Sequence, residues 1–476
     1  MTSTIALPVS LAEPDPDALT FNVENPATGE VVAKVADHGT DSALVMLREV
    51  ESAGLAWSAF SPRQRSDVLM TAHNLMIERR ADLARLISLE NGKSHLDALG
   101  EVSYAAEYFR WYAEEAVRLR GELFENPTGT NKVLVSHEPI GVCLLVTPWN
   151  FPAAMATRKI APAIAAGCSA ILKPAAETPL TALAIADILE EAGLPDGVLR
   201  VVTTTSASDV VGALMREPAV RMISFTGSTP VGRVLQRQAS ESIMRSAMEL
   251  GGNAPFLVLK DADLDAALDG AMVAKLRNGG QACTAANRFY VHSSVHDRFA
   301  EAFAARFDAV SVGDAADESV ACGPLINDAA VAKVQELVDD ALARGARVIT
   351  SARVPAGPGS FFPPTVLVDV PSESRILHEE VFGPVAAIVR FEEEEEAVKA
   401  ANATEFGLVA YLYTRDLARG LRLSARLQAG MIALNRGLVS DPAAPFGGVK
   451  QSGIGREGSH EGLLEYVETK YVATDW

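Results

Sequence analysis

Cysteine is scarce in this chain, with four residues in 476, at positions 143, 168, 283 and 322. No two of them form a CxxC pair, which argues against a disulfide scaffold and a structural zinc site and favours a reducing compartment. Positive charge is also in short supply, because 42 Lys and Arg face 61 Asp and Glu, giving a net charge of −19. Nucleic acids and anionic membranes are therefore poor partners, since both require an excess of cations.

Long apolar runs are absent as well, and none approaches the roughly 20 residues that a membrane span requires. The N-terminal stretch MTSTIALPVSLAEPDPDALT has no basic segment followed by an apolar one, as a secretory signal would. We therefore expect a cytoplasmic protein with a mobile leading arm. The negative charge raises one problem, because an anionic substrate needs cations placed directly at its binding site.

The chain does contain the patterns of a large α/β protein of two or three lobes. Apolar residues recur at helical spacing from Thr40 to about Arg120, and the stretch from 66 to 92 ends on Asn91-Gly92, a helix stop. From Lys132 onward, strands alternate with Ala-rich helices, which predicts a parallel, doubly wound sheet. The strands are KVLVSHEP, GVCLLVTPW, SAILKP, VLRVVT and RMISFTG, and the helices TRKIAPAIAAG and PLTALAIADILEEAGLP.

A second α/β series follows Gly252, with the strands APFLVL, RFYVH, ARVIT, AAIVRF and GMIALN. The acidic run from Glu392 to Glu396 is expected to begin a helix, where carboxylates favour the positive end of the dipole. The tail EGLLEYVETKYVATDW ends in a strand-like segment that could add to a partner's sheet.

The stretch SFTGSTPVGR joins a strand to a helix through Thr226, Gly227 and Ser228, with Thr229 able to cap and Pro230 at a first helical position. Backbone N–H groups at such a helix start form an anion site suited to a dinucleotide pyrophosphate. Gly-rich turns of this kind are common, so a plain structural turn explains the stretch equally well.

Cys283 lies in a polar, glycine-rich loop, LRNGGQACTAANR, which differs from the apolar surroundings of Cys143 and Cys168. Those two cysteines and Cys322 are expected to be buried structural residues. From its loop alone, Cys283 could be a reactive thiol or an inert one. Ala285 stands two residues after it, which excludes a local disulfide switch at that spacing.

Four further motifs surround this loop in the chain: TPWNFP at 147–152, ELGGNAPF at 249–256, EEVFGPV at 379–385 and PFGGVKQSG at 445–453. Together with the loop, they resemble the aldehyde dehydrogenase superfamily across nearly the whole chain. The resemblance implies NAD(P)-dependent oxidation of an aldehyde to a carboxylic acid, with no metal.

The fold implied is a Rossmann-like cofactor domain (1–118 and 141–251), an α/β catalytic domain (252–455) and a small β oligomerisation extension (119–140 and 456–476). Members of the superfamily assemble as dimers or as dimers of dimers, so a homodimer or homotetramer is expected.

The resemblance also implies catalytic roles that make chemical sense here. The Cys283 thiolate would attack the aldehyde carbon, forming a thiohemiacetal. The Asn150 amide and the Cys283 backbone N–H would hold the oxyanion, a contribution of about 3 kcal/mol per donor. Glu249 would then deprotonate the water that hydrolyses the thioester. Without the family pattern, Glu249 is read as a surface carboxylate beside a Gly-Gly turn.

Cofactor contacts implied by the resemblance are Lys173 to the adenosine ribose, Gly227 and Ser228 to the pyrophosphate, Glu380 to the nicotinamide ribose, Phe382 beside the nicotinamide ring and Trp149 through its backbone. Members that prefer NAD often carry Glu three residues after this lysine, where it repels a 2′-phosphate. Here that residue is Ala176, with Glu177 one step later. We therefore expect NADP+, with NAD+ also possible.

Within the superfamily the chain is most similar to succinate semialdehyde dehydrogenases, through NFPAAMATRKIAP, the KLRNGGQAC loop and GLVS. Two arginines and a serine grip the substrate carboxylate in that subfamily, and they map onto Arg158, Arg277 and Ser440. Arg158 lies eight residues after Asn150, about two helical turns, which predicts nearly the same face. The alternative is a pair of surface arginines in salt bridges.

Other functions stay open from the sequence. The same chemistry could act on glutarate semialdehyde, on another ω-carboxylated aldehyde or on a neutral one. A non-catalytic protein could keep the fold, although the set of Cys283, Glu249 and Asn150 argues against this. A coenzyme A acylating enzyme is disfavoured because Glu249 provides a base for water.

Overall fold

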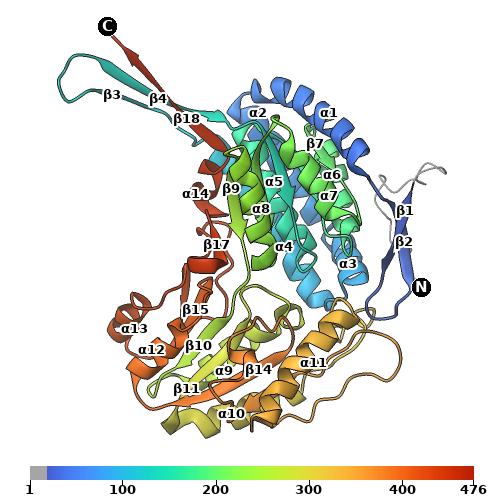
Figure 1. The fold of residues 1–476 in the computed structure, drawn as a ribbon, viewed down its shortest axis with the longest axis vertical. Coiled ribbons are helices and arrows are strands. Elements are labelled where there is room, and N and C mark those ends of the chain that lie inside the picture. Colours follow the sequence, from blue (N-terminus) through green and yellow to red (C-terminus); the bar gives the residue numbers. More distant parts are fainter. Residues whose placement is uncertain (1–18, 476) are drawn as a thin grey trace.

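The computed structural model describes residues 19–475, and the predicted leading arm at 1–18 lies outside them. The described chain forms two stacked α/β lobes and an arm that projects from the upper lobe (Figure 1). Within residues 19–475, no helix combines the length and apolar character needed to cross a membrane. The same residues contain no group of three His, Cys, Asp or Glu side chains that could hold a metal ion.

The predicted helical region near the N-terminus is confirmed. It consists of α1 (Thr40–Ser58), α2 (Pro62–Glu78), α3 (Arg80–Asn91) and α4 (His95–Ala116). The stretch from 66 to 92 is two helices rather than one, because the chain turns at Arg79. The predicted helix end at Asn91-Gly92 is confirmed, because Gly92 ends α3 with a left-handed φ of 84°.

The upper lobe contains a six-stranded sheet in the order β17-β9-β8-β5-β6-β7, parallel except for β17. Its strands are β5 (Val142–Val146), β6 (Ser169–Lys173), β7 (Leu199–Val201), β8 (Val220–Thr226), β9 (Arg245–Glu249) and β17 (Gly453–Ile454). The connecting helices are α5 (Pro152–Ala166), α6 (Pro179–Glu191), α7 (Ala207–Arg216) and α8 (Thr229–Glu241). The predicted parallel, doubly wound sheet is confirmed.

Alternation along the buried strands explains why helices cover both faces of this sheet. Leu145 and Leu172 pack into a core shared with α2, α4, α5 and α6. Leu144 and Ile171, each one residue away, pack into a second core with α1 and α7. Successive side chains of a strand point to opposite faces, so a strand that is apolar throughout is buried on both.

The lower lobe contains a seven-stranded sheet in the order β12-β13-β14-β11-β10-β15-β16, parallel except at β12. Its strands are β10 (Ala254–Val258), β11 (Ala286–His292), β12 (Arg347–Val348), β13 (Thr365–Val368), β14 (Val385–Phe391), β15 (Val409–Tyr413) and β16 (Met431–Leu434). Its helices are α9 (Leu264–Leu276), α10 (Ser293–Asp308), α11 (Asp328–Ala343), α12 (Glu394–Asn402) and α13 (Leu417–Ser424). The acidic run begins α12, as predicted, whereas ARVIT supplies only a two-residue antiparallel edge strand.

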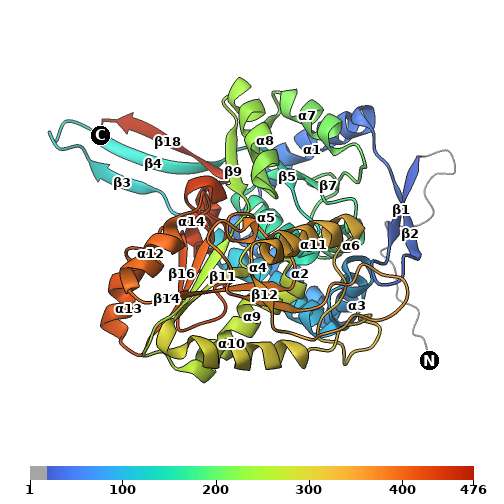
Figure 2. The same ribbon diagram turned by 60° about the horizontal axis from the view of Figure 1, so that its bottom comes forward.

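The arm is a separate antiparallel sheet of β3 (Glu122–Glu125), β4 (Lys132–Pro139) and β18 (Val467–Thr474), which follows α14 (Ser459–Leu464) (Figures 1 and 2). The prediction that KVLVSHEP belongs to the strand series of the parallel sheet is therefore wrong, because it forms β4. The strand predicted in the tail is confirmed, and it pairs with β4 of the same chain along eight residues.

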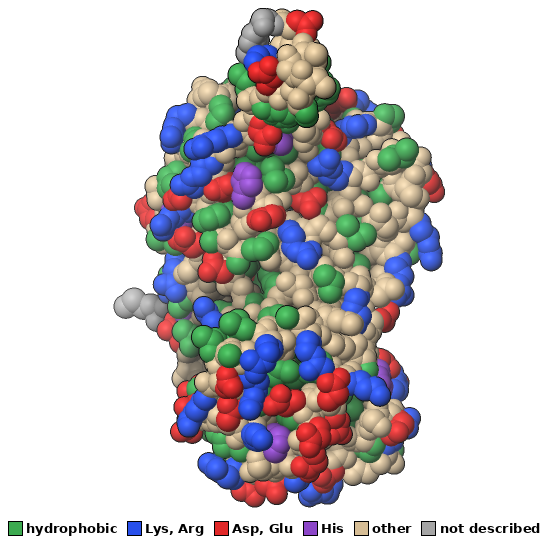
Figure 3. Space-filling model, turned by 90° about the vertical axis from the view of Figure 1, so that its left-hand side faces the viewer, with side chains coloured by type: hydrophobic (Ala, Val, Ile, Leu, Met, Phe, Trp, Pro, Cys, Tyr) green, Lys and Arg blue, Asp and Glu red, His purple; other side chains and the backbone are tan. Residues whose placement is uncertain are grey.

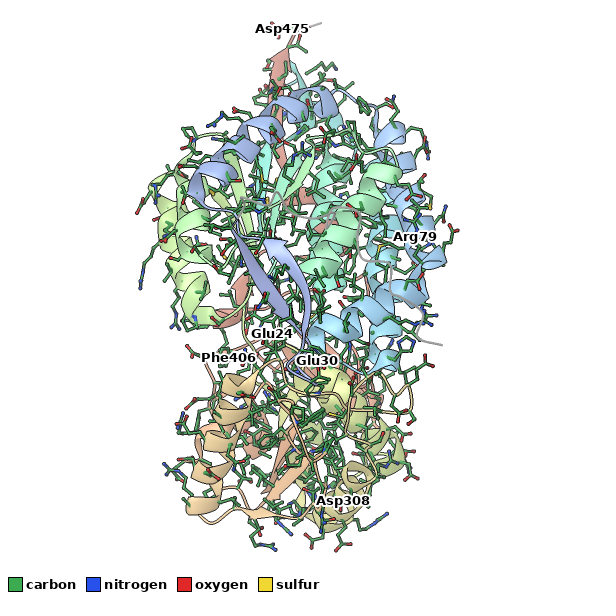
Figure 4. All side chains as sticks on the ribbon, turned by 90° about the vertical axis from the view of Figure 1, so that its right-hand side faces the viewer. Glu24, Glu30, Arg79, Asp308, Phe406 and Asp475 are labelled. Atoms are coloured by element: carbon green, nitrogen blue, oxygen red, sulfur yellow. The ribbon has the colours of Figure 1, made fainter. Side chains whose placement is uncertain are left out.

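A hairpin of β1 (Thr20–Glu24) and β2 (Val31–Ala36) runs along the upper lobe to the waist of the molecule (Figure 4). Its turn connects to the lower lobe, because the N–H of Ser360 donates to the carbonyl of Pro26 at 3.0 Å. The turn thus ties together the two lobes that flank the site described next.

Candidate active site

A cavity of about 380 Å³ is lined by residues of both lobes. The upper lobe contributes the turns after β5 and β8, at the carboxyl ends of parallel strands, where α/β sheets bind ligands. The lower lobe contributes the loop before β11, the loop before β14 and α11. The lining includes Trp149, Asn150, Gly227, Ser228, Cys283, Glu380 and Phe382. The predicted nucleophile therefore shares one cavity with most of the predicted cofactor residues.

The start of α8 faces this cavity. Ser228 is the N-cap, with extended backbone angles, and Thr229 is the first helical residue. The prediction that Thr229 caps the helix is wrong, because its hydroxyl instead donates to the carbonyl of Gln451 at 3.2 Å. Within residues 19–475, no side chain accepts from the first N–H groups of α8, which leaves this helix end able to bind an anion.

The loop before Cys283 has an unusual backbone. Asn278, Gly279 and Gly280 all have left-handed φ values, at 51°, 60° and 78°. Glycine tolerates this conformation and Asn is among the few other residues that adopt it, which explains the sequence Asn-Gly-Gly. The loop turns sharply after α9, so that Cys283 lies partly exposed while its neighbours are buried.

The thiol of Cys283 lies in surroundings of mixed charge. Burial raises its pKa to about 12, and the charges of Arg158 and Arg277 act in the opposite direction. Glu380 and Glu249 add to the rise in pKa. Cys143, Cys168 and Cys322 are buried free thiols, as predicted.

Asn150 lies in the turn between β5 and α5, next to this loop. Its side-chain Nδ2 donates to the carbonyl of Gln281 at 3.0 Å, and its Oδ1 has no hydrogen-bond partner within the described residues. Asn150 lines the cavity, and the second N–H of its amide is not used by this hydrogen bond. The argument from helical spacing is wrong, because α5 begins only at Pro152, after Asn150.

Glu249 is the last residue of β9 and is buried, with both carboxylate oxygens lacking hydrogen-bond partners in residues 19–475. Burial and the nearby Glu457 raise its pKa well above the usual range, while Arg158 and Lys159 lower it. It is therefore not the surface carboxylate of the alternative reading.

Arg158 and Lys159 of α5 are both buried, and both bind Glu457. The distances are 2.7 Å from Arg158 Nε to Glu457 Oε2 and 2.6 Å from Lys159 Nζ to Glu457 Oε1. The guanidinium of Arg158 also lies 4.1 Å above the ring of Phe446. Lys159 and Glu457 were not predicted as site residues, because a charged residue with no evident partner in the sequence normally lies on the surface.

Arg277 and Ser440 come together, as the mapping predicted. Arg277 Nη1 donates to Ser440 Oγ at 3.2 Å, and its guanidinium lies 4.5 Å from the ring of Phe151. Stacking on an aromatic ring orients a guanidinium while its remaining N–H groups stay available. Neither arginine is the simple surface residue of the alternative reading.

Glu380 and Phe382 line the cavity from the loop before β14. Glu380 Oε1 accepts from the N–H of Gly252 at 3.0 Å, and burial raises its pKa to about 7. Phe382 has a left-handed φ of 54° and meets the ring of Trp149 edge-on at 5.4 Å. Such backbone conformations are costly for a bulky residue and concentrate at functional sites. Lys333 of α11 also lines the cavity and was not predicted.

Lys173 ends β6, beside the turn that follows β5. Burial lowers its pKa, and Glu177 acts in the opposite direction. Ala176 is half-buried and Glu177 exposed in the loop that leads to α6. These residues do not line the cavity itself, so their contact with a cofactor stays a prediction.

Comparisons with known proteins agree over nearly the full length. The model of the aldehyde dehydrogenase family matches residues 14–472. A succinate-semialdehyde dehydrogenase of Paenarthrobacter nicotinovorans is 50% identical, over 93% of this chain and 98% of its own length. A glutarate-semialdehyde dehydrogenase of Pseudomonas aeruginosa is 46% identical, over 95% and 94%. The crystal structure of an NADP-dependent enzyme from E. coli is 46% identical, with a TM-score of 0.94, covering 96% of this chain and 95% of the other.

Proposed function

Because the chain belongs to the aldehyde dehydrogenase family, we propose that it oxidises succinate semialdehyde to succinate, with Cys283 as the nucleophile. The chain is an NAD(P)-dependent aldehyde oxidoreductase with the α/β fold of that family. One observation carries the choice of substrate: Arg277, six residues before Cys283 in the chain, donates from Nη1 to Ser440 Oγ at 3.2 Å, which brings together two of the expected carboxylate-binding groups.

The arginines offset the charge problem of this chain. Its net charge of −19 repels an anionic substrate as a whole, so the carboxylate must be bound by local cations. Arg277 and Ser440 supply one set of donors, and Arg158 supplies another through Nη2, which has no hydrogen-bond partner among the described residues. Guanidinium groups suit this task because they bind a carboxylate through two parallel hydrogen bonds.

The chemistry at Cys283 begins when the thiol loses its proton. The sulfur then forms a bond to the aldehyde carbon, and the carbonyl oxygen becomes an oxyanion. The free N–H of the Asn150 amide and the backbone N–H of Cys283 hold this oxygen. Loss of hydride from the carbon leaves a thioester on the sulfur.

The cavity fits a nicotinamide dinucleotide. A Cβ on Gly251 would come within 2.9 Å of Glu380 Oε2, so a side chain there would crowd the carboxylate proposed to bind the ribose. The N–H groups at the start of α8 would hold the pyrophosphate, and Phe382 would flank the nicotinamide. When bound, the cofactor accepts the hydride. We propose NADP+ as the preferred form, because no carboxylate stands at position 176.

Glu249 completes the reaction by taking a proton from water, which attacks the thioester carbon. The bond to sulfur breaks and the carboxylic acid leaves, and the proton held by Glu249 passes to the sulfur, so that Cys283 regains a thiol and Glu249 its basic form. The two carboxylate oxygens of Glu249 have no other partner among the described residues and can therefore accept this proton.

Replacing Arg277 with Met tests the substrate. Kinetics on succinate semialdehyde and on butyraldehyde, a neutral aldehyde of equal length, should separate charge recognition from chemistry. We expect kcat/KM to fall about 100-fold for the charged aldehyde, since a charged hydrogen bond contributes roughly 1.5–3 kcal/mol, and about threefold or less for the neutral one. Equal losses on both aldehydes would refute the carboxylate clamp.

A glutarate semialdehyde assay on the same enzyme distinguishes the second candidate, which the similarity to a glutarate-semialdehyde dehydrogenase favours. A higher kcat/KM for glutarate semialdehyde than for succinate semialdehyde would assign the five-carbon aldehyde as the substrate. Arg277→Lys is the variant matched to Arg277→Met, because it keeps the positive charge and removes only the planar guanidinium group.

We also propose a cytoplasmic homodimer or homotetramer. All four cysteines are unpaired thiols, which suits a reducing compartment. The arm formed by β3, β4 and β18 would join the copies, with 119–140 and 456–476 as an oligomerisation extension beside a cofactor domain (1–118, 141–251) and a catalytic domain (252–455).

A further inference from the structure

A buried ion pair that the proposed chemistry does not use lies behind the cavity. Lys93, between α3 and α4, donates to the carboxylate of Glu101 on α4, and both side chains are fully buried. Removing two charges from water costs several kcal/mol per ion, so such a pair is weak evidence of stabilisation by itself. The groups that the two side chains hold in place are therefore more informative than the stability of the pair itself.

Lys93 Nζ also donates to the backbone carbonyl of Asn150, at 2.7 Å. A second donor, the side-chain Nδ2 of Asn278, binds the same carbonyl oxygen at 2.7 Å. A carbonyl has two lone pairs, so both are occupied and the orientation of this peptide is fixed. The side chain of Asn150 starts from that peptide.

Glu101 fixes the chain a few residues after Asn150, at the start of α5. Its Oε1 accepts from the N–H groups of Ala153 and Ala154, at 2.8 and 3.2 Å, in the first turn of α5. A carboxylate at this position also complements the positive end of the helix dipole. One ion pair thus holds both the Asn150 carbonyl and the first turn of α5, the segment that directly follows the Asn150 side chain.

The same part of α4 reaches the nucleophile loop. Asp97 Oδ2 accepts from the N–H of Asn278 at 2.8 Å, where the backbone is left-handed. The carbonyl of Gln281, two residues before Cys283, accepts from the Asn150 amide. The two loops that provide the oxyanion donors are therefore joined through α4 and Asn278.

We propose that Lys93 is a positioning residue for the reaction: with Glu101 and Asn278, it holds the Asn150 peptide so that the free side-chain N–H points at the substrate oxygen. The inference rests on the proposed role of Asn150 in binding the oxyanion. Lys93 itself does not touch the substrate. An error of about 1 Å in such a donor can lower a rate about 100-fold, which makes the effect measurable.

The principal test is the double variant Lys93→Met/Glu101→Gln. The single change Lys93→Met would leave a buried, unpaired carboxylate and destabilise the fold. The double variant removes both charges at similar volume, and the amide oxygen of the introduced glutamine can still accept from the start of α5. We expect a melting temperature within a few degrees of the parent, unchanged affinity for NADP+, and kcat lowered about 10- to 100-fold with KM for the aldehyde nearly constant.

A double-mutant cycle with Asn150→Ala separates positioning from general damage. Asn150→Ala alone should lower kcat about 100- to 1,000-fold, as the loss of an oxyanion donor does. In the Lys93→Met/Glu101→Gln background, we expect Asn150→Ala to lower kcat by less than about tenfold, because a misaligned donor already contributes little to the rate. Losses that multiply would show that Lys93 acts independently of Asn150 and would overturn the inference.

A second variant covers the case in which the double variant fails to fold. Asn278→Gly removes the other donor to the Asn150 carbonyl and keeps a residue that accepts the left-handed backbone. It should also lower kcat without raising KM, and full activity would refute the inference. Arg65→Met, which removes a buried cation bound to the carbonyl of Phe60, is the matched control and should keep kcat.

The two proposals can fail separately. If Asn150→Ala alone keeps full kcat, the oxyanion role of Asn150 in the proposed function is wrong, and the inference about Lys93 falls with it. If Asn150→Ala is inactive and the Lys93 variants are fully active, only the inference is wrong.

Discussion

Cys283, the proposed nucleophile, has to lose its proton before it can attack an aldehyde, because a thiolate and not a thiol is nucleophilic. Burial raises its pKa to about 12, so the free enzyme holds a neutral thiol at neutral pH. We therefore expect the rate of Cys283 alkylation by iodoacetamide, without cofactor, to rise about tenfold per pH unit from pH 7 to pH 9. Mass spectrometry of the labelled peptide follows this rate.

Arg277→Met provides a control for that experiment. Because the charge of Arg277 lowers the pKa of the thiol, its removal should slow alkylation at each pH. A rate that levels off near pH 8 in the parent enzyme would contradict the raised pKa.

Glu249 has its own pH dependence, which lies at higher pH than that of an ordinary exposed carboxylate. Burial and Glu457 raise its pKa, so the carboxyl is protonated at a pH where exposed carboxylates are ionised. The basic form increases with pH, and thioester hydrolysis should accelerate accordingly. In Glu249→Gln, we expect a stoichiometric burst of NADPH followed by steady turnover at least about 100-fold slower. Steady turnover equal to the parent rate would remove Glu249 from the mechanism.

Several residues of the site were predictable because the motifs contain them together, as in the loop of Cys283. Lys93 and Glu101 were not, because each is a charged residue, for which exposure to solvent is the normal outcome. Their pairing depends on the packing of α3, α4 and α5, which local sequence does not encode. Glu457, far along the chain from Arg158 and Lys159, escaped prediction for the same reason.

At the scale of elements, the buried strands were the most predictable. β5 and β10 are continuous apolar runs between turn residues, and both formed where predicted. β9, with Arg, Ser and Glu among its five residues, gave no such signal, because its neighbours β8 and β17 define it. β15 is the apolar run VAYLY, a pattern typical of a buried strand, but it was not predicted.

The loop between β6 and α6 is the element that should decide between the two cofactors. Ala176 lies in it, three residues after Lys173. We expect Ala176→Glu to raise KM for NADP+ at least about tenfold through repulsion of the 2′-phosphate, and to change KM for NAD+ about threefold or less. Steady-state kinetics with both cofactors measure this.

Ala176→Gln is the matched control for size, because it adds a side chain of the same length without charge. It should keep the preference for NADP+. A loss of NADP+ affinity equal to that of Ala176→Glu would mean that the size of the side chain, not its charge, determines the cofactor preference.

At the scale of the whole molecule, the arm presents a row of apolar side chains to solvent. Leu123, Leu134 and Val472 are cross-strand neighbours and are 59%, 38% and 46% exposed. Figure 3 views the arm end-on and shows hydrophobic side chains on it at the top of the molecule. An exposed apolar row of this kind is typical of a surface that meets another copy.

Leu134→Lys should therefore weaken assembly. Light scattering on the parent enzyme should give a multiple of 50.4 kDa, and the variant should shift toward the monomer. Val348→Lys, at an exposed strand edge of the lower lobe, is the matched control and should leave the mass unchanged. A variant that keeps the parent mass would exclude the arm as the principal contact.

The return of the chain to the upper lobe near its end has a consequence for how the protein is made. Glu249 ends β9, whose outer neighbour β17 is Gly453–Ile454, and β4 lacks its partner until Val467–Thr474 exists. A ribosome that has finished the strands of the lower lobe has therefore still not supplied the last strand beside Glu249. Nascent chains stalled or truncated before residue 453 would carry a complete Cys283 loop in the lower lobe and an unfinished sheet in the upper lobe, whose open edge at β9 would be available for aggregation.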